Sequence, residues 1–184
     1  MLRDAGFRID AIPALIDEEK EKHRLSASGA KPAEIALGLA ELKALMVGAK
    51  NPEKVTLGAD QLLVCDGKFY AKARNSEDAK QILRELAGKK HELVTAAVLV
   101  QNRRILWRHV ESPSLWMRKL DEDDIGAYAR AAGSALLDCV GGYRIEEAGR
   151  ALFGRIDGDE FTIQGLPLSA TCSALKRLGI RPSA

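Results

Sequence analysis

The sequence predicts an α/β protein in which helices flank a mixed β-sheet. Runs rich in Val and Leu alternate with segments of helical periodicity, and turn residues separate the two kinds of segment. Several runs are joined by tight turns, as in antiparallel hairpins, and the order is not the regular strand–helix–strand series of a parallel sheet. Internal repeats, low-complexity tracts and linkers are absent from the sequence, so we expect a single domain over residues 1–184.

Length and composition narrow the class of protein. The 184 residues, 46% hydrophobic and 29% charged, suffice for one core or for one core folded around a cleft. A net charge of +2 gives no basic field, so we expect no nucleic-acid polymer as a partner. There is no apolar run of membrane-spanning length and no signal-peptide pattern, and three widely spaced cysteines without a CxxC pair fit a reducing compartment. We therefore expect a cytoplasmic protein without a membrane partner.

Met1 to Gly6 are expected to form the C-terminal end of a helix. A strand of alternating polarity is expected to follow over residues 7–12. A charged run over residues 17–22 is typical of a solvated face. After a loop over residues 26–31, Pro32 opens a helix to Val47, in which four residues share one apolar face: Ile35, Leu39, Leu42 and Met46.

The stretch from Lys54 to Lys68 organises the rest of the chain. Its Val- and Leu-rich run predicts a strand, and Asp66-Gly67 is a strong signal for a two-residue hairpin. Asp60 lies inside this run, where a buried strand normally carries an apolar side chain. A carboxylate there must be solvated, paired or bound to a metal. Asp60 is thus either a satisfied structural carboxylate or a functional one.

Further along, Ser76 opens a helix that ends at Gly88, and Asp121 caps another helix that ends at Gly133. Gly165-Leu166-Pro167 introduces a last helix with Leu168, Cys172, Leu175 and Leu178 on its buried side. The intervening strands are expected over residues 92–101, 104–111, 115–118, 142–145, 151–156 and 160–163.

Common nucleotide-binding and hydrolase signatures are absent from the sequence, including GxGxxG, GxxxxGK[ST], HExxH and GxSxG.

Lys43 lies beside the apolar face of the helix over residues 32–47. Taken alone, it is either a surface lysine or a ligand for a phosphate group.

Short segments follow one another in a distinctive order. They are Ile16-Asp17-Glu18, Leu42-Lys43-Ala44, Gly58-Ala59-Asp60-Gln61, Lys72, Leu86-Ala87-Gly88-Lys89-Lys90-His91, Val94-Thr95-Ala96, Gly141-Gly142-Tyr143-Arg144-Ile145-Glu146 and Ile163-Gln164-Gly165-Leu166-Pro167-Leu168. In this order they resemble the Maf family of nucleoside triphosphate pyrophosphatases, and the resemblance extends from the first residue to about Gly179.

The resemblance implies hydrolysis of a nucleoside triphosphate to a monophosphate and diphosphate. It implies a fold similar to that of the inosine triphosphatases, an elongated mixed sheet flanked by helices with two lobes around a cleft. A divalent cation, Mg²⁺ in our expectation, is the implied cofactor, and a nucleoside triphosphate the implied small-molecule partner. The oligomeric state that we expect is a homodimer.

The resemblance also implies roles for individual residues. Asp60 would orient or deprotonate the attacking water, which requires a carboxylate in its ionised form. Lys43 and Lys72 match the phosphate-binding lysines, and with this context we interpret Lys43 as a phosphate ligand. Glu18 and Asp60 would hold the metal ion.

Gln61 and Glu146 bear on the substrate. In the branch that acts on dTTP and UTP, Thr usually follows the aspartate and the later motif ends in Gln, whereas this chain has Gln61 and Glu146. The pair resembles that of the branch acting on 7-methyl-GTP. A carboxylate could accept hydrogen bonds from guanine N1–H and the 2-amino group, which a pyrimidine does not offer.

Other polar residues of these segments are left outside the catalytic set. His91 is interpreted as a structural, hydrogen-bonded histidine at the start of a strand rather than a general acid. Arg118, Tyr143 and Arg144 are each either cleft residues or structural contacts.

The chain departs from the family pattern in two places. The family begins with a strand and a Ser-rich, Arg-containing loop that grips phosphates, and residues 1–6 align with the helix that follows it, so we interpret the chain as truncated relative to the family. Ala71-Lys72-Ala73 replaces the family's Gly-Lys-Pro, which removes a rigid proline. The alternatives to a 7-methyl-GTP-type enzyme are therefore a weakened or non-catalytic regulatory protein linked to septum formation, and a dTTP/UTP-type pyrophosphatase.

Overall fold

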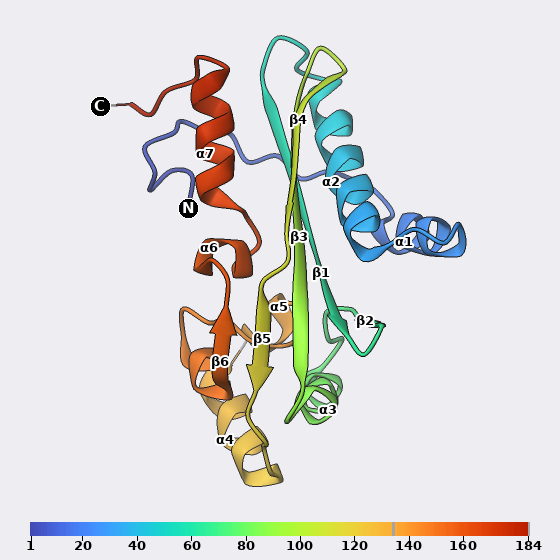
Figure 1. Ribbon diagram of the computed structural model, residues 1–184, viewed down its shortest axis with the longest axis vertical. Helices are drawn as coiled ribbons and strands as arrows, with labels where there is room; N and C mark the ends of the chain where they lie inside the picture. Colours follow the sequence, from blue (N-terminus) through green and yellow to red (C-terminus); the bar gives the residue numbers. More distant parts are fainter. Residues whose placement is uncertain (134, 184) are drawn as a thin grey trace. The chain divides into compact units, whose positions relative to one another are not determined.

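The computed structural model describes residues 1–133 and 135–183, and they form two compact units. The first unit comprises Met1–Gln61, Thr95–Glu111 and Gly165–Ala184, and the second comprises Leu62–Val94 and Ser112–Gln164. The ribbon in Figure 1 shows helices alongside long strands. Strands β1 (Thr56–Cys65) and β3 (Lys90–Gln101) contribute residues to both units.

The strands form one sheet with the order β2-β1-β3-β5-β6, and β4 also pairs with β3. The pairs of β1 with β2 (Lys68–Tyr70), β3 with β4 (Arg104–Glu111), β3 with β5 (Ser114–Met117), and β5 with β6 (Phe153–Asp157) are antiparallel. The prediction of an α/β protein with a sheet flanked by helices is confirmed.

Two-residue turns join β1 to β2 and β3 to β4. Asp66 and Gly67 take φ values of 50° and 76° between β1 and β2, which is the left-handed geometry that a two-residue hairpin requires. Asn102 and Arg103 join β3 to β4 with φ values of 48° and 58°. The register pairs Gln101 directly with Arg104.

The described residues of the first unit form the helices α1 (Glu18–Ala27), α2 (Pro32–Gly48) and α7 (Leu168–Arg177). Helix α1 begins after Asp17, whose side chain accepts a hydrogen bond from the Lys20 backbone, and it buries no residue. Helix α2 begins at Pro32, as predicted, and is buried through Ile35, Ala36, Leu39, Ala40, Ala44 and Gly48. The predicted apolar face was partly wrong, because Met46 is exposed.

The second unit holds the remaining helices around its own part of the sheet. They are α3 (Ser76–Leu86), α4 (Glu122–Ala132), α5 (Ala135–Asp138), the 3₁₀ helix η1 (Ala148–Leu152) and α6 (Glu160–Ile163). Helix α3 begins at Ser76, as predicted, and Asn75 caps it; Asp121 caps α4, as predicted. Each cap side chain accepts a hydrogen bond from a backbone N–H of the first turn.

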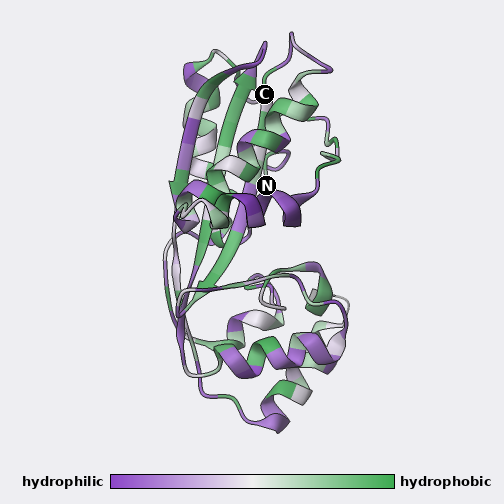
Figure 2. Cartoon of the chain, turned by 90° about the vertical axis from the view of Figure 1, so that its right-hand side faces the viewer, coloured by the Kyte–Doolittle hydropathy of each residue, from purple (hydrophilic) through white to green (hydrophobic). Residues whose placement is uncertain are grey.

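Each unit has its own apolar core. In the first unit, Phe7, Ala97, Leu99 and Leu168 belong to one buried cluster. The larger cluster of the second unit includes Leu63, Leu83, Leu115, Ile125 and Tyr143. Figure 2 shows the strands largely in hydrophobic colours and the helices carrying both kinds of residue, as one-sided burial requires.

Four segments differ from the predicted secondary structure. Residues 7–12 are not a strand, and residues 1–6 form turns in which the Ala5 N–H donates to the Met1 carbonyl at 2.9 Å. Residues 142–145 are a loop, since Gly141 and Gly142 have φ values of 83° and 73°.

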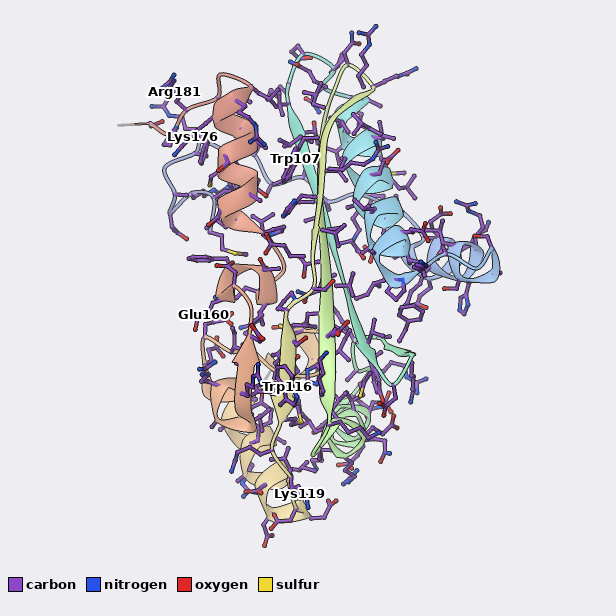
Figure 3. The ribbon with its side chains drawn as sticks, in the orientation of Figure 1. Trp107, Trp116, Lys119, Glu160, Lys176 and Arg181 are labelled. Atoms are coloured by element: carbon purple, nitrogen blue, oxygen red, sulfur yellow. The ribbon has the colours of Figure 1, made fainter. Side chains whose placement is uncertain are left out.

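The segment from Glu160 to Ile163 is a helix rather than the predicted strand (Figure 3 labels Glu160). Asp159 caps it by accepting a hydrogen bond from the Thr162 N–H at 2.9 Å. Alternating polarity over four residues does not separate a strand from a single helical turn, and here the capping residue decides between them.

The outer surface of the second unit includes a tryptophan between two cations. Trp116 on β5 (labelled in Figure 3) is the register partner of Lys90 on one side and Arg155 on the other. The Arg155 guanidinium lies 4.4 Å and the Lys90 ammonium 5.6 Å from the indole.

Within the described parts of the chain, residues 1–133 and 135–183, no helix has the length and hydrophobicity needed to cross a membrane.

Candidate active site

Strand β1 and helix α2 approach each other closely at Gly58. A Cβ atom at this position would lie 2.2 Å from the Ala40 carbonyl oxygen and 2.8 Å from the Ala44 nitrogen. Only glycine fits at such a distance. The contact brings β1 against the part of α2 that carries Lys43. Asp60 follows Gly58 by two residues on β1.

Lys43 lies between two carboxylates. Its Nζ donates a hydrogen bond to Asp60 Oδ1 at 2.6 Å and forms an ion pair with Glu18 Oε1 at 2.8 Å. The Asp60 side chain is only 6% exposed, whereas the Glu18 side chain is 53% exposed. A buried carboxylate of this kind needs a partner, and Lys43 supplies it.

The surroundings shift the pKa values of both partners. Burial raises the pKa of Asp60 above its ordinary value, and the hydrogen bond and charge of Lys43 oppose this change without cancelling it. Burial lowers the pKa of Lys43, but the hydrogen bonds and charges of Asp60 and Glu18 outweigh burial, so its pKa is raised. Lys43 is therefore a cation, and Asp60 accepts a proton more readily than an exposed aspartate.

Lys43 also lines a cavity of about 650 Å³ within the first unit. Its walls come from β1, from α2 and from the N-terminal segment, and include Thr56, Leu57, Gly58, Ala59, Val47, Phe7, Ile9 and Ile12. A ligand in this cavity could reach the ammonium of Lys43.

Glu18 and Asp60, the residues predicted to hold a metal ion, face the same ammonium group. Two carboxylates that converge on one cation provide the oxygen ligands that Mg²⁺ prefers, with further positions left for water and phosphate. No group of three or more His, Cys, Asp or Glu side chains with metal-binding geometry occurs in the described parts of the chain. The donor set fits a cation that is shared with a substrate rather than one enclosed by protein ligands.

Gln61, predicted to contact the base, is held by a buried threonine. Its Nε2 donates a hydrogen bond to the Thr95 Oγ1 at 2.8 Å, and Thr95 is fully buried on β3. This contact fixes the plane of the Gln61 carboxamide directly after Asp60. Thr95 was not singled out from the sequence, although a polar residue inside a long apolar strand is a signal that could have identified it.

Lys72 and Glu146 lie in the second unit. Lys72 is exposed, and its backbone forms an isolated antiparallel bridge with Val140. Val140 directly precedes the loop that carries Glu146, so the two predicted substrate residues come from neighbouring segments. Glu146 is exposed. The structure thus brings together the side chains of Glu18, Lys43 and Asp60 in one unit, with Gln61 next along β1, and the segments of Lys72 and Glu146 in the other.

The remaining polar residues have structural contacts. His91 is buried and its Nε2 lies 2.6 Å from the Tyr143 hydroxyl, in agreement with the structural interpretation. Arg118 donates to the Ala151 carbonyl at 2.8 Å. Arg144 forms ion pairs with Asp138 and Glu147 at 2.9 and 3.2 Å.

A buried, proton-accepting carboxylate beside a lysine is suited to activating water next to an anionic group that the lysine binds. The fold and this centre are those of an α/β protein whose geometry is compatible with chemistry on phosphorylated compounds. The family model described as Maf-like protein matches residues 1–178, and the chain belongs to the Maf family.

Curated relatives agree with this assignment. The chain is 45% identical over 168 residues, 91% of its length and 85% of the relative's, to a protein of Granulibacter bethesdensis named nucleoside triphosphate pyrophosphatase. It is 41% identical over 179 residues, 97% of its length and 90% of the relative's, to a 7-methyl-GTP pyrophosphatase of Mesorhizobium japonicum. A nucleoside triphosphate pyrophosphatase of Paramagnetospirillum magneticum is 40% identical over 179 residues, which cover 97% of this chain and 92% of the relative.

Proposed function

We propose that the protein is a nucleoside triphosphate pyrophosphatase, which hydrolyses a nucleoside triphosphate to a monophosphate and diphosphate. The observation that carries the proposal is the 2.6 Å contact between the buried Asp60 carboxylate and the Lys43 ammonium. Membership of the Maf family and the printed names of the relatives support the choice of substrate class.

Asp60 is the general base of the proposed reaction. It removes a proton from water, whose oxygen forms a bond to the α-phosphorus while the bond from that phosphorus to the α–β bridging oxygen breaks. The bridging oxygen and its electron pair leave with diphosphate. The high acceptor strength of Asp60, which follows from its burial, favours this role.

Lys43 and Lys72 are the proposed phosphate ligands. A lysine ammonium binds phosphate oxygens as a point charge and stabilises the negative charge that moves onto the leaving group. Lys43 must exchange its contact with Asp60 for one with a phosphate oxygen when a substrate binds. That exchange leaves Asp60 free to accept a proton.

Glu18 and Asp60 are the proposed ligands of a divalent cation, for which Mg²⁺ is our choice. When bound, the cation would neutralise phosphate oxygens that the lysines do not reach. Lys43 would give up both carboxylates in that state, so metal binding and the movement of Lys43 toward substrate are expected to occur together.

Gln61 and Glu146 are proposed to select 7-methyl-GTP. The orientation of the Gln61 amide by Thr95 supports a recognition role, because a fixed amide discriminates between hydrogen-bond donors and acceptors. Several relatives are named 7-methyl-GTP pyrophosphatase. The homodimer and the cytoplasmic location expected from the sequence remain predictions.

The proposed activity is tested by measuring kcat/KM for 7-methyl-GTP, GTP, dTTP and UTP with Mg²⁺, together with nucleotide affinity. Asp60→Asn should abolish turnover and leave binding within a few-fold. Glu41→Gln is the matched control and should retain activity, because Glu41 lies on α2 like Lys43 but pairs with Arg108 of β4.

Other results would replace the proposal. Turnover of Asp60→Asn at the parent rate would remove Asp60 from the mechanism. Binding of nucleotides without hydrolysis by the parent would favour a regulatory protein, and a parent that prefers dTTP or UTP would belong to the pyrimidine-specific type.

A further inference from the structure

The loop that carries Glu146 is fixed by buried side chains on other elements. We call residues 141–147 the specificity loop. It has no strand or helix of its own, so backbone hydrogen bonds to neighbouring strands do not hold it in place. Turn hydrogen bonds shape it locally, from the Gly142 N–H to the Cys139 carbonyl at 3.1 Å and from the Glu147 N–H to the Arg144 carbonyl at 3.3 Å, and side-chain contacts join it to other elements.

The first contact joins His91 on β3 to Tyr143 within the loop. The imidazole Nε2 lies 2.6 Å from the phenolic oxygen, and the two rings are 5.7 Å apart between centroids. Phe153 packs edge-on against Tyr143 at 4.8 Å and tilts against His91 at 5.7 Å. His91 is 1% exposed and Tyr143 is 4% exposed, so water does not compete for the hydrogen bond.

The direction of this hydrogen bond follows from its surroundings. His91 Nδ1 is buried and has no partner among residues 1–133 and 135–183. If Tyr143 O–H donates to Nε2, only the Nδ1–H lacks an acceptor. The reverse direction would leave both Nδ1 and the hydroxyl hydrogen unpaired, which is costlier in a buried site. Tyr143 is therefore the donor, and His91 is the acceptor that holds it.

The second contact joins Tyr128 on α4 to the loop. Its hydroxyl donates to the Gly142 carbonyl at 3.0 Å, immediately before Tyr143. Gly141 cannot be replaced by another residue without strain. Its φ is 83°, and an added Cβ would lie 2.7 Å from the Leu63 side chain and 2.7 Å from the Tyr143 ring. Adjacent loop residues are thus held from two different elements, three residues before Glu146.

We propose that His91 and Tyr128 are positioning residues for substrate selection, which act through Tyr143 and the Gly142 carbonyl to hold Glu146 in place. The inference rests on the proposed function, since it assumes that Glu146 reads the base. Burial and hydrogen bonding explain why these residues are polar in an otherwise apolar core.

Tyr143→Phe and Tyr128→Phe test the proposal, because each removes one hydroxyl and keeps the ring. The matched control is Tyr70→Phe, which removes a hydroxyl that donates to Glu85 in the same unit and, among the described residues, makes no hydrogen bond to residues 141–147. The readout is the ratio of kcat/KM for 7-methyl-GTP to that for UTP. A purely structural defect lowers both values together and leaves the ratio unchanged.

We expect Tyr143→Phe and Tyr128→Phe each to lower this ratio about fivefold, the effect of losing one orienting hydrogen bond, and Tyr70→Phe to leave it unchanged. Hydrogen exchange should become faster for the amides of residues 141–147 in the first two variants and not in the control. An unchanged ratio in both loop variants, with Glu146→Gln altering it, would overturn the positioning role.

Hydrogen exchange separates failure of the inference from failure of the proposed function. If the parent hydrolyses no nucleotide, or if Glu146→Gln leaves the ratio unchanged, the proposed function or its base reader is wrong. Faster exchange confined to residues 141–147 would still support the two anchors. If the amides of residues 141–147 exchange no faster in Tyr143→Phe and Tyr128→Phe than in Tyr70→Phe, the two side chains do not anchor the loop.

Discussion

Gly58 of β1 lies against Ala40 of α2 so closely that a Cβ at Gly58 would be 2.2 Å from the Ala40 carbonyl oxygen. This approach has a consequence for the candidate active site, because Lys43 follows Ala40 on the same helix and Asp60 follows Gly58 on the same strand. The length of the lysine side chain then suffices to place its ammonium 2.6 Å from the carboxylate.

Gly58→Ala should separate α2 from β1 and weaken the contact between Lys43 and Asp60. We expect a loss of about 1–3 kcal/mol in the free energy of unfolding, as for other overpacked sites, and a larger relative loss of activity. Denaturant unfolding and kcat/KM measure the two effects. Gly126→Ala in α4, where the added Cβ meets only Arg130 at 3.5 Å, is the control and should be neutral or slightly stabilising. Equal behaviour of the two variants would contradict the close-packing argument.

Lys43→Met should destabilise the first unit, because Asp60 is left buried without its counter-charge. The expected cost is about 1–3 kcal/mol in the free energy of unfolding, together with a loss of nucleotide affinity. Lys54→Met offers a matched comparison, since Lys54 pairs with Asp10 at 3.2 Å between side chains that are 57% and 75% exposed. That pair should contribute almost nothing. If both lysines prove equally dispensable, the Asp60 contact has no energetic importance.

His91 should make the protein less stable in acid. Burial lowers its pKa from 6.5 to about 4, so between these values the unfolded chain binds more protons than the folded one. The free energy of unfolding should therefore be unaffected above about pH 6.5 and fall as the pH decreases toward 4, by roughly 3 kcal/mol in total. Unfolding at a series of pH values measures the slope. His91→Gln should flatten it, whereas His23→Gln on exposed α1 should preserve it; a parent slope retained in His91→Gln would exclude His91 as its source.

Thr95→Val should relax substrate selection by removing the acceptor that orients Gln61. Valine is close to threonine in shape, so the core of β3 is preserved while the hydroxyl that accepts from Gln61 is removed. We expect the preference for 7-methyl-GTP over UTP to fall about fivefold, and Thr95→Ser to retain it because the hydroxyl remains. Steady-state kinetics on the two nucleotides provides the comparison. A serine variant that fails as badly as the valine variant would point to packing instead of orientation.

The elements that the sequence predicted well are those with strong local signals. The Asp66-Gly67 hairpin, the Pro32 start of α2 and the Asp121 cap of α4 each depend on the chemistry of one or two residues. The predictions of strands over residues 7–12 and 142–145 were wrong for a different reason. Strand formation requires a hydrogen-bonded neighbour, and residues apart in the sequence determine whether one is present.

The contacts within the candidate site could not be predicted from the sequence, and the roles of its residues remain predictions. Asp60 stood out because a carboxylate interrupts an apolar run, and Lys43 because of the family resemblance. The sequence did not indicate that Lys43 joins Asp60 to Glu18, since that contact depends on the close approach at Gly58. The hydrogen bond from Tyr128 to the Gly142 carbonyl likewise depends on tertiary structure.

The most direct test of the proposed function is hydrolysis of 7-methyl-GTP in ¹⁸O-labelled water, followed by mass analysis of both products. Attack of water on the α-phosphorus places the label in 7-methyl-GMP and leaves diphosphate unlabelled. We expect this distribution in the parent and no product from Asp60→Asn. Label in diphosphate, release of single phosphate groups, or equal turnover of the two proteins would contradict the account.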